Sequence, residues 1–305
     1  MPQHDRRPVR RSRFDDDAPH RRGRRRFDDE DQEPPERRHS FDTPAPDGPA
    51  TGDRWSTWEV AQHGPQPHPD WLVTELAAVD TELGILKTGK EADVHLLHRG
   101  VPGASRSCLL AAKRYRSAEH RMFHRDAAYT EGRRVRRSRE TRAMARRTSF
   151  GRELLAGQWA RAEFDALSML WTAGAAVPYP VQIIGTELLV EFLGDPSGTA
   201  APRLAEISDR GADLDPLWEQ LVEAMVLLAR CGYAHGDLSA YNLLVHDGRL
   251  VMIDLPQAVD VVTNPNGPAF LDRDARTVAG WFTAHGRPCD PDELVDLLRS
   301  EARLV

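Results

Sequence analysis

The chain has few residues that form covalent or metal-based cross-links. Its three cysteines, Cys108, Cys231 and Cys289, are odd in number and far apart, and their spacing matches no metal-binding motif. We expect reduced thiols without a functional role. No apolar run is long enough to span a bilayer, and the charged start has no signal-peptide pattern. These absences predict a soluble, cytoplasmic protein.

Lysine and asparagine are also scarce. Of 41 lysines and arginines, only Lys87, Lys90 and Lys113 are lysine, and one of the three asparagines is Asn242. A GC-rich genome disfavours both residue types, which would leave them mainly where Arg or Asp cannot replace them. Chance is the alternative explanation. We therefore treat the segments around these four residues as candidate functional segments.

Residues 1–70 differ from the rest of the chain. They are rich in Pro, Arg and Asp, poor in aliphatic residues, and contain a crude repeat, RSRFDDD at 11–17 and RRRFDDE at 24–30. A segment with so few apolar side chains to bury cannot offset the conformational entropy that is lost when a chain becomes ordered. We expect a disordered, charged arm that serves either as a docking segment or only as a solvated tail.

Residues 71–193 alternate short apolar runs with Gly and Pro, as successive strands do. A short helix is expected over Asp70 to Val79, and a longer one over Glu153 to Ala173 with Gly174 as its C-cap. The expected strands are Leu83 to Leu86, Val94 to Leu97, Leu109 to Lys113, Val181 to Ile184 and Leu188 to Phe192. Five antiparallel strands with one helix between the third and fourth match the small lobe of a kinase.

Residues 194–305 are expected to be mostly helical. Pro216 to Gly232 has one apolar face, with Asp215 placed as an N-cap. A hairpin turning at Asp247-Gly248 follows, and then helices near 272–285 and 291–303. The sequence thus predicts an α+β, bilobal, protein-kinase-like fold with a reduced large lobe.

The most specific motif is HGDLSAYN, residues 235–242, which precedes that hairpin. Asp237, Asn242 five residues later, and Asp254 at the end of the hairpin have the spacing by which protein kinases surround ATP phosphates. Asp237 is expected to orient the attacking hydroxyl or water as the catalytic base. Asn242 and Asp254 are expected to supply oxygen ligands to Mg²⁺. The motif indicates phosphoryl transfer from ATP.

Lys113 closes the third strand in LLAAKRY, where a kinase carries the lysine that contacts the α- and β-phosphates. Such a lysine needs a carboxylate partner on the following helix. Glu163 is the better candidate because it lies on the buried side of that helix. Glu153 is the weaker one, since acidic residues are favoured at a helix start in any case.

The segment KTGKEADV, residues 87–94, joins the first two strands and is expected to fold over the phosphates. Backbone N–H groups near Thr88 and Gly89, together with Lys90, are the candidate contacts; a simple polar turn is the alternative. GILKTGKE resembles a P-loop but ends in Glu91 where Ser or Thr is required, and a strand follows in place of a helix. A P-loop NTPase is therefore excluded.

Taken together, KTGKEADV, AAKRYR, WARAEFDAL, VEFLG, HGDLSAYNLLV and IDLPQAVD resemble the RIO-type atypical protein kinases, most of all the type-one subfamily. The resemblance covers about Leu83 to Phe282. It implies a kinase fold without an activation loop, a serine/threonine kinase or ATPase activity, and a hinge at Glu191 to Leu193 that holds adenine. It gives Asp237, Lys113 and the two metal ligands the same roles as above. The eukaryotic and archaeal members of the family act in maturation of the small ribosomal subunit, often more as ATPase switches than as kinases.

Residues 114–152 are strongly basic, with 13 arginines against four acidic residues on a chain of net charge −6. Such an excess attracts phosphate backbones, so RNA or the small ribosomal subunit is a candidate partner and a solvated loop the alternative. Two other functions stay open: a small-molecule phosphotransferase of the aminoglycoside or choline kinase kind, which shares the HGD loop, and a nucleotide-gated binding module for RNA or ribosomes.

Overall fold

The computed structural model describes residues 48–116, 149–207, 213–255 and 258–304. The chain divides into two units, Met1–Pro46 and Asp47–Val305, and every described residue belongs to the second. Within the described ranges, no helix is both long and apolar enough to cross a membrane. Most of the expected basic segment, residues 117–148, lies outside the described residues.

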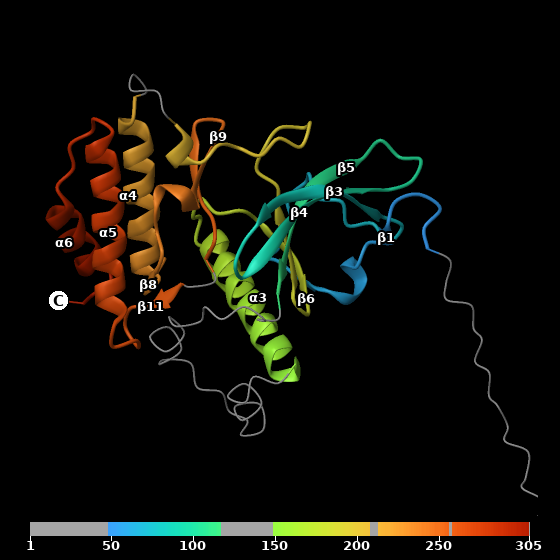
Figure 1. Ribbon diagram of the computed structural model, residues 1–305, viewed down its shortest axis with the longest axis horizontal. Coiled ribbons are helices and arrows are strands. Elements are labelled where there is room, and N and C mark those ends of the chain that lie inside the picture. The colour runs from blue at the N-terminus through green and yellow to red at the C-terminus, as the bar shows by residue number, and fades with distance from the viewer. Residues whose placement is uncertain (1–47, 117–148, 208–212, 256–257, 305) are drawn as a thin grey trace, which may run out of the picture. The chain divides into compact units, whose positions relative to one another are not determined.

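The main sheet has seven antiparallel strands in the order β1-β3-β4-β5-β7-β6-β2 (Figure 1). Its five longer strands are β3 (Val79–Thr88), β4 (Ala92–Gly100), β5 (Ser107–Tyr115), β6 (Pro180–Ile184) and β7 (Glu187–Glu191). Helix α3 (Ser149–Thr172) comes between the third and fourth of these. This order confirms the predicted five strands and single helix.

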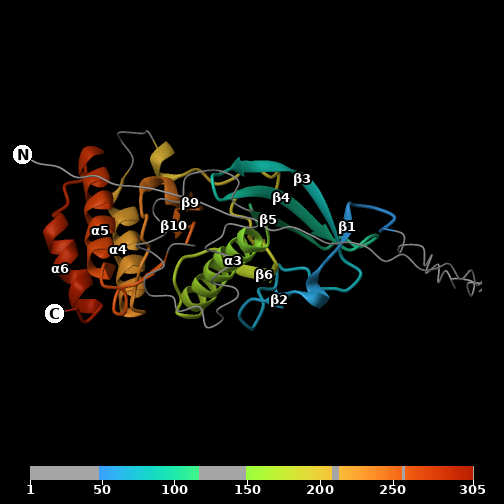
Figure 2. The ribbon, with the colours of Figure 1, turned by 60° about the horizontal axis from the view of Figure 1, so that its bottom comes forward.

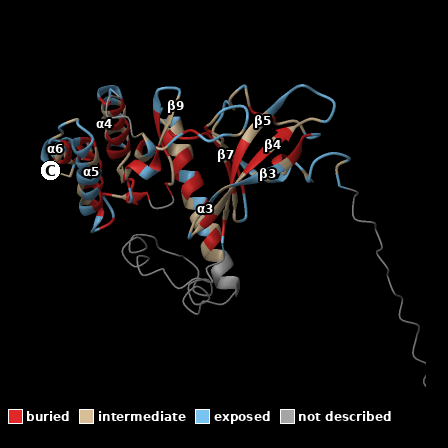
Figure 3. Cartoon of the chain, turned by 45° about the horizontal axis from the view of Figure 1, so that its top comes forward, coloured by how far each residue is buried: buried red, intermediate tan, exposed pale blue. Residues whose placement is uncertain are grey.

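Helix α3 packs on one face of the sheet through small residues and a few large ones. Its buried positions include Ala156, Ala160, Phe164, Leu167 and Leu170, which recur at helical spacing. Figure 3 shows buried residues along α3 and along β4 and β5. Gly174 follows the helix with φ 86°, the left-handed conformation that glycine adopts most readily. The predicted C-cap is confirmed.

The other face of the sheet is covered by an N-terminal strap, residues 53–72. The strap contains β1 (Arg54–Trp55), the 3₁₀ turn η1 (Trp58–Val60) and β2 (Gln62–His63). Strand β1 pairs with β3 at one edge of the sheet, and β2 pairs with β6 at the other. Trp58 and Leu72 are buried between them in a cluster with Leu97, Leu110 and Tyr179.

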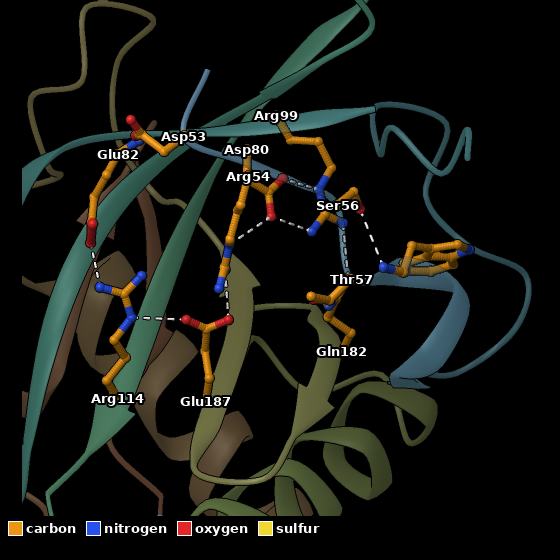
Figure 4. Close-up of polar contacts among 11 residues, drawn as sticks. Asp53, Arg54, Ser56, Thr57, Asp80, Glu82, Arg99, Arg114, Gln182 and Glu187 are labelled. Atoms are coloured by element: carbon orange, nitrogen blue, oxygen red, sulfur yellow. Dashed lines mark hydrogen bonds and ion pairs between the residues drawn. The ribbon is translucent and has the colours of Figure 1, made fainter. Parts of the chain in front are cut away.

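A polar network fastens the strap to the sheet (Figure 4). Arg99, which has no exposed surface, donates from Nε and Nη2 to the two carboxylate oxygens of Asp80 at 2.7 and 3.0 Å. It also donates to Oε1 of Gln182 at 2.9 Å, and the Gln182 amide donates to Oγ1 of Thr57 at 2.7 Å. Arg54 of β1 donates to Glu187 of β7 at 2.6 Å. The buried charges of Arg99 and Asp80 are thus paired and hydrogen-bonded, as burial requires.

The strap corrects the expected arm for residues 48–70, while residues 1–47 lie outside the described part. Composition pointed to disorder because the strap has few aliphatic residues. Its order depends instead on one buried tryptophan, Trp58, and on charge pairs with residues far along the chain. The expected helix over Asp70 to Val79 is also wrong: these residues form turns and extended chain, and β3 begins at Val79.

The C-terminal part is mostly helical, as predicted. It contains α4 (Asp215–Arg230), α5 (Gly267–Ala284) and α6 (Pro291–Glu301), which pack against one another (Figure 1). A short pair, β8 (Tyr233–Ala234) with β11 (Val259–Asp260), lies beside α5. The N-cap of α4 is Leu214, so Asp215 is its first residue and not its cap.

The hairpin of β9 (Leu243–His246) and β10 (Arg249–Met252) lies between α4 and the main sheet (Figure 2). Asp247 and Gly248 have φ 51° and 74°, which fits a two-residue turn with both residues left-handed. The predicted hairpin is confirmed. One continuous core extends from α3 through Met252 and Leu255 to the C-terminal helices. The hairpin belongs to this core, so the segments before and after it are held between α3 and the C-terminal helices.

Candidate active site

The HGDLSAYN loop is attached at both ends to one residue, Ile253. At its start, the His235 ring accepts from the backbone N–H of Asp237 at Nδ1 over 3.4 Å, and its Nε2 donates to the carbonyl of Ile253 over 3.0 Å. At its end, the carbonyl of Asn242 accepts from the Ile253 N–H at 3.0 Å. Asp254 is the residue after Ile253. These hydrogen bonds therefore hold the backbone of the loop that carries Asp237 and Asn242 against the backbone that carries Asp254.

A buried carboxylate on α5 holds the middle of this loop. Asp274 accepts from the backbone N–H groups of Gly236 and Leu238 at 2.7 and 3.1 Å. These two residues flank Asp237, so Asp274 fixes the backbone that carries it. Burial raises the pKa of Asp274, and the nearby His235 and the two N–H donors oppose that rise. The side chain of Asp237 is exposed and therefore accessible to an acceptor substrate.

Asn242 is oriented by its own loop. It lies in the 3₁₀ turn η3 (Ala240–Asn242) and is buried. Its side-chain nitrogen donates to the carbonyl of Asp237 at 2.9 Å. With the nitrogen committed, the amide oxygen is the atom left to contact a cation. The predicted spacing between Asp237 and Asn242 thus has two effects. It lets the Asn242 side chain close a turn on the Asp237 carbonyl, and it places the two functional groups on one loop.

Asp254 has a left-handed backbone, with φ 67°. Aspartate tolerates this conformation better than most residues, and such positions cluster at functional sites. Its Oδ1 accepts from Nζ of Lys113 at 2.7 Å. Burial opposes ionisation of Asp254, but the Lys113 ammonium outweighs it and holds the pKa of this carboxyl below its usual range.

Lys113 and Glu163 meet as predicted, with Nζ 2.8 Å from Oε1 of Glu163. Burial opposes the charge on Lys113, but Glu163 and Asp254 outweigh it and raise its pKa. Glu163 is itself buried and also accepts from the Tyr115 hydroxyl and, at 3.2 Å, from the backbone N–H of Leu255. Glu163 therefore links α3, β5 and the segment that carries Asp254.

The turn between β3 and β4 holds Thr88, Gly89 and Lys90. The N–H of Gly89 donates to the carbonyl of Ala92 at 2.9 Å, and a Cβ on Gly89 would lie 2.7 Å from that oxygen. The close approach explains the glycine. The Gly89 N–H is used inside the turn, whereas Lys90 is exposed. Phosphate contacts from this turn stay a prediction.

The expected hinge, Glu191 to Leu193, follows directly from β7. The Glu191 carboxylate accepts from the backbone N–H of Tyr179 at 3.0 Å, and burial raises its pKa. Leu193 is buried in a small cluster with Ala201 and Val251, and its carbonyl accepts from the Ala201 N–H at 2.9 Å. These contacts position the hinge; its contact with adenine stays a prediction.

The residues present fit a magnesium ion. Asp254 and Asn242 offer one carboxylate and one amide oxygen, the hard ligands that Mg²⁺ prefers. Among the described residues there is no group of three or more His, Cys, Asp and Glu side chains that would hold a metal by themselves. Mg²⁺ is usually held by one or two carboxylates together with waters and substrate phosphates.

The sequence analysis missed three residues of this site: Asp274, Tyr115 and the ring of His235. Asp274 lies in a polar stretch, DRD, on an amphipathic helix, and nothing in the pattern marks it as buried. Tyr115 follows Lys113 by two residues and therefore projects on the same face of β5, which is a usable signal. The contact of His235 with Ile253 joins residues 18 positions apart and requires the fold.

The model of the RIO domain family matches residues 110–294. A RIO-type serine/threonine-protein kinase Rio1 from Haloferax volcanii is 41% identical over 143 residues, covering 47% of this chain and 48% of that protein. The Rio1 kinase from Thermoplasma acidophilum is 32% identical over 144 residues, covering 47% of this chain and 73% of that protein.

Among solved structures, a complex of Rio2 kinase from Chaetomium thermophilum with ADP/Mg²⁺ and phosphoaspartate aligns with a TM-score of 0.49 at 19% identity. The alignment covers 73% of this chain and 66% of that one. The match to the Haloferax protein spans about half of that protein's length.

Proposed function

The chain belongs to the RIO domain family, and from this premise and the geometry of the site we propose that it transfers phosphoryl groups from ATP as a RIO-type serine/threonine kinase or ATPase. The observation that carries the proposal is the position of Lys113, bonded at once to Glu163 and Asp254. An ammonium held between a helix carboxylate and a metal-ligand carboxylate is the arrangement by which kinases grip ATP phosphates.

Each residue has a distinct role in this proposal. Lys113 contacts the α- and β-phosphates, and Glu163 keeps it in place. Asp237 accepts a hydrogen bond from the attacking hydroxyl or water and takes its proton. As the new bond to the γ-phosphorus forms, the bond from that phosphorus to the bridging oxygen breaks and ADP leaves. Asp274 and His235 hold the loop so that the Asp237 carboxylate is already positioned before substrate arrives.

Asn242 and Asp254 would hold Mg²⁺, which when bound neutralises the phosphate charge. In the described structure the Asp254 carboxylate contacts Lys113. Lys113 and Asp254 thus keep each other charged until both engage the nucleotide.

The RNA or ribosome partner rests on the basic stretch, residues 114–152, most of which lies outside the described residues. It stays a prediction from composition. A nucleotide-gated binding module that rarely hydrolyses ATP also stays a prediction, because it differs from the enzyme only in its rate of hydrolysis. A small-molecule phosphotransferase gains no support from the described residues beyond the HGD loop that it shares.

The test is nucleotide titration with and without magnesium. Wild type should bind ATP more tightly with Mg²⁺ than without it. Asp254→Ala should lose this dependence, because a primary ligand is gone. Asp272→Ala is the matched control, since Asp272 is a partly buried carboxylate on α5 that pairs with Arg299 at 2.8 Å and has no role in the proposed metal site. If Asp254→Ala retains the full magnesium effect, the assignment of the metal site is wrong.

A further inference from the structure

Lys87 lies on the same face of the sheet as the phosphate lysine. It is directly opposite Val94 on β4, and Val94 is directly opposite Lys113 on β5. Directly paired residues of neighbouring strands project to one side of a sheet. Lys87 is therefore two strands from Lys113, about 10 Å at the usual strand spacing, on the side where the site is built.

The ammonium of Lys87 has no counter-charge in contact. Within the described ranges it makes no hydrogen bond or ion pair, and the residue as a whole is exposed although its ammonium is partly buried. Its surroundings lower its pKa, first through partial burial and then because Arg203 and Lys113 lie near, against the pull of Asp254. Arg203 and Lys113 repel the Lys87 ammonium, and an anion bound among these groups would offset the repulsion.

Arg203 lies close to Lys87 but comes from a different segment of the chain. It follows the hinge and forms a backbone bridge with Leu244, and the carbonyl of the preceding Pro202 accepts from Val245 at 2.9 Å. Leu244 is two residues after Asn242 on the same chain segment, so Arg203 is anchored beside a proposed metal ligand. Its guanidinium has no carboxylate within ion-pair distance among the described residues.

We propose that Lys87 and Arg203 form a second phosphate clamp, which holds the polyphosphate of a nucleotide and makes nucleotide affinity rise steeply with the number of phosphates. The inference rests on the proposed function, because it requires a nucleotide at Lys113. Lys113 is committed to the α- and β-phosphates and to Glu163, whereas Lys87 and Arg203 are the charged donors left for the remaining phosphate oxygens. A bound polyphosphate would relieve the repulsion between them.

The experiment is titration of the full chain with ATP, ADP and adenosine in wild type, Lys87→Met and Arg203→Met. Methionine keeps much of the apolar stem and removes only the charge. Each substitution should weaken ATP binding by about ten-fold or more, the scale of one charge-assisted hydrogen bond. ADP should be weakened less, and adenosine should bind within about two-fold of wild type. Arg276→Met, which removes an exposed ion pair with Asp292, is the control and should change none of the three.

The outcomes separate this inference from the proposed function. If wild type binds none of the nucleotides, the proposed function fails and the clamp fails with it. If wild type binds ATP and both variants bind it equally well, only the clamp is refuted. Equal weakening of ATP and adenosine also refutes it, because the residues would then shape the pocket and not hold phosphates.

Discussion

Replacing Glu163 by Gln tests the centre of the site with a change of one charge and almost no change of shape. The Glu163 carboxylate accepts from Lys113, from the Tyr115 hydroxyl and from the Leu255 N–H. Glutamine keeps one acceptor oxygen for Lys113 and Leu255. Its NH₂ group can donate to the Tyr115 oxygen if that hydroxyl rotates. The substitution thus removes the charge while leaving most hydrogen bonds possible.

The expected loss of stability follows from the burial of the pair. Breaking a buried ion pair by removing one partner commonly costs about 3–5 kcal/mol. Here Lys113 keeps a second carboxylate, Asp254, at 2.7 Å, and no buried cation is left unpaired. We therefore expect a smaller loss, about 1–3 kcal/mol in the free energy of unfolding.

Function should suffer in the same variant. With Glu163 neutral, Asp254 is the remaining carboxylate that holds Lys113, so the lysine is pulled toward the metal ligand and away from α3. ATP affinity should fall by about ten-fold, equivalent to about 1.4 kcal/mol. Urea unfolding followed by circular dichroism measures the first effect, and nucleotide titration the second.

Glu153→Gln is the matched control, because it makes the same change on the same helix at the other carboxylate considered as a partner. It should stay within about 0.5 kcal/mol of wild type, because the ammonium of Lys113 is bonded to Glu163 and Asp254. The reasoning is refuted if Glu163→Gln is as stable as wild type and binds ATP equally well. It is refuted too if Glu153→Gln has the larger effect.

Three further predictions concern the surrounding structure. Arg99→Met should lower the free energy of unfolding by about 3–5 kcal/mol in urea titrations, because Asp80 would keep only the distant contact with Arg54 at 3.7 Å; an unchanged midpoint would contradict the network. A chain beginning at residue 71 should melt roughly 10 °C below one beginning at residue 48, because the strap that covers the sheet is lost; equal melting temperatures would show that the strap adds nothing. Burial raises the pKa of Asp274. The protonated Asp274 side chain therefore makes its full contribution to the free energy of unfolding below about pH 4, and this contribution is lost as pH rises through the raised pKa. Asp274→Asn should abolish that dependence and cost about 1–3 kcal/mol, as urea midpoints across pH 4–8 would reveal; an unchanged pH dependence would contradict the assignment.

The sequence predicted those parts of the fold in which local pattern and packing agree. The turn at Asp247 and Gly248 needs two left-handed residues, and its sequence supplies them. The apolar spacing of α3 matches the face that it buries. Lys113 and Glu163 were paired correctly because a strand end and a buried helix position leave few alternatives.

The sequence failed where order comes from distant partners. The strands of the strap are two residues long and have no periodicity to detect. Their order depends on Arg54 meeting Glu187, 133 residues away. The expected helix over Asp70 to Val79 failed for a related reason, since Val79 and Asp80 pair with Gly100 and Arg99 at the far end of β4. Asp274 was missed because only the fold brings it under the loop.

The measurement that tests the central claim most directly is phosphate release from ATP by wild type and by Asp237→Asn, with Mg-ATP affinity measured on the same samples. The proposal predicts a loss of about a hundred-fold or more in turnover, the scale of a lost general base, while affinity stays within a few-fold because Asp237 does not hold the metal. If Asp237→Asn turns over as fast as wild type, the HGDLSAYN loop is not catalytic and the proposed enzyme is wrong.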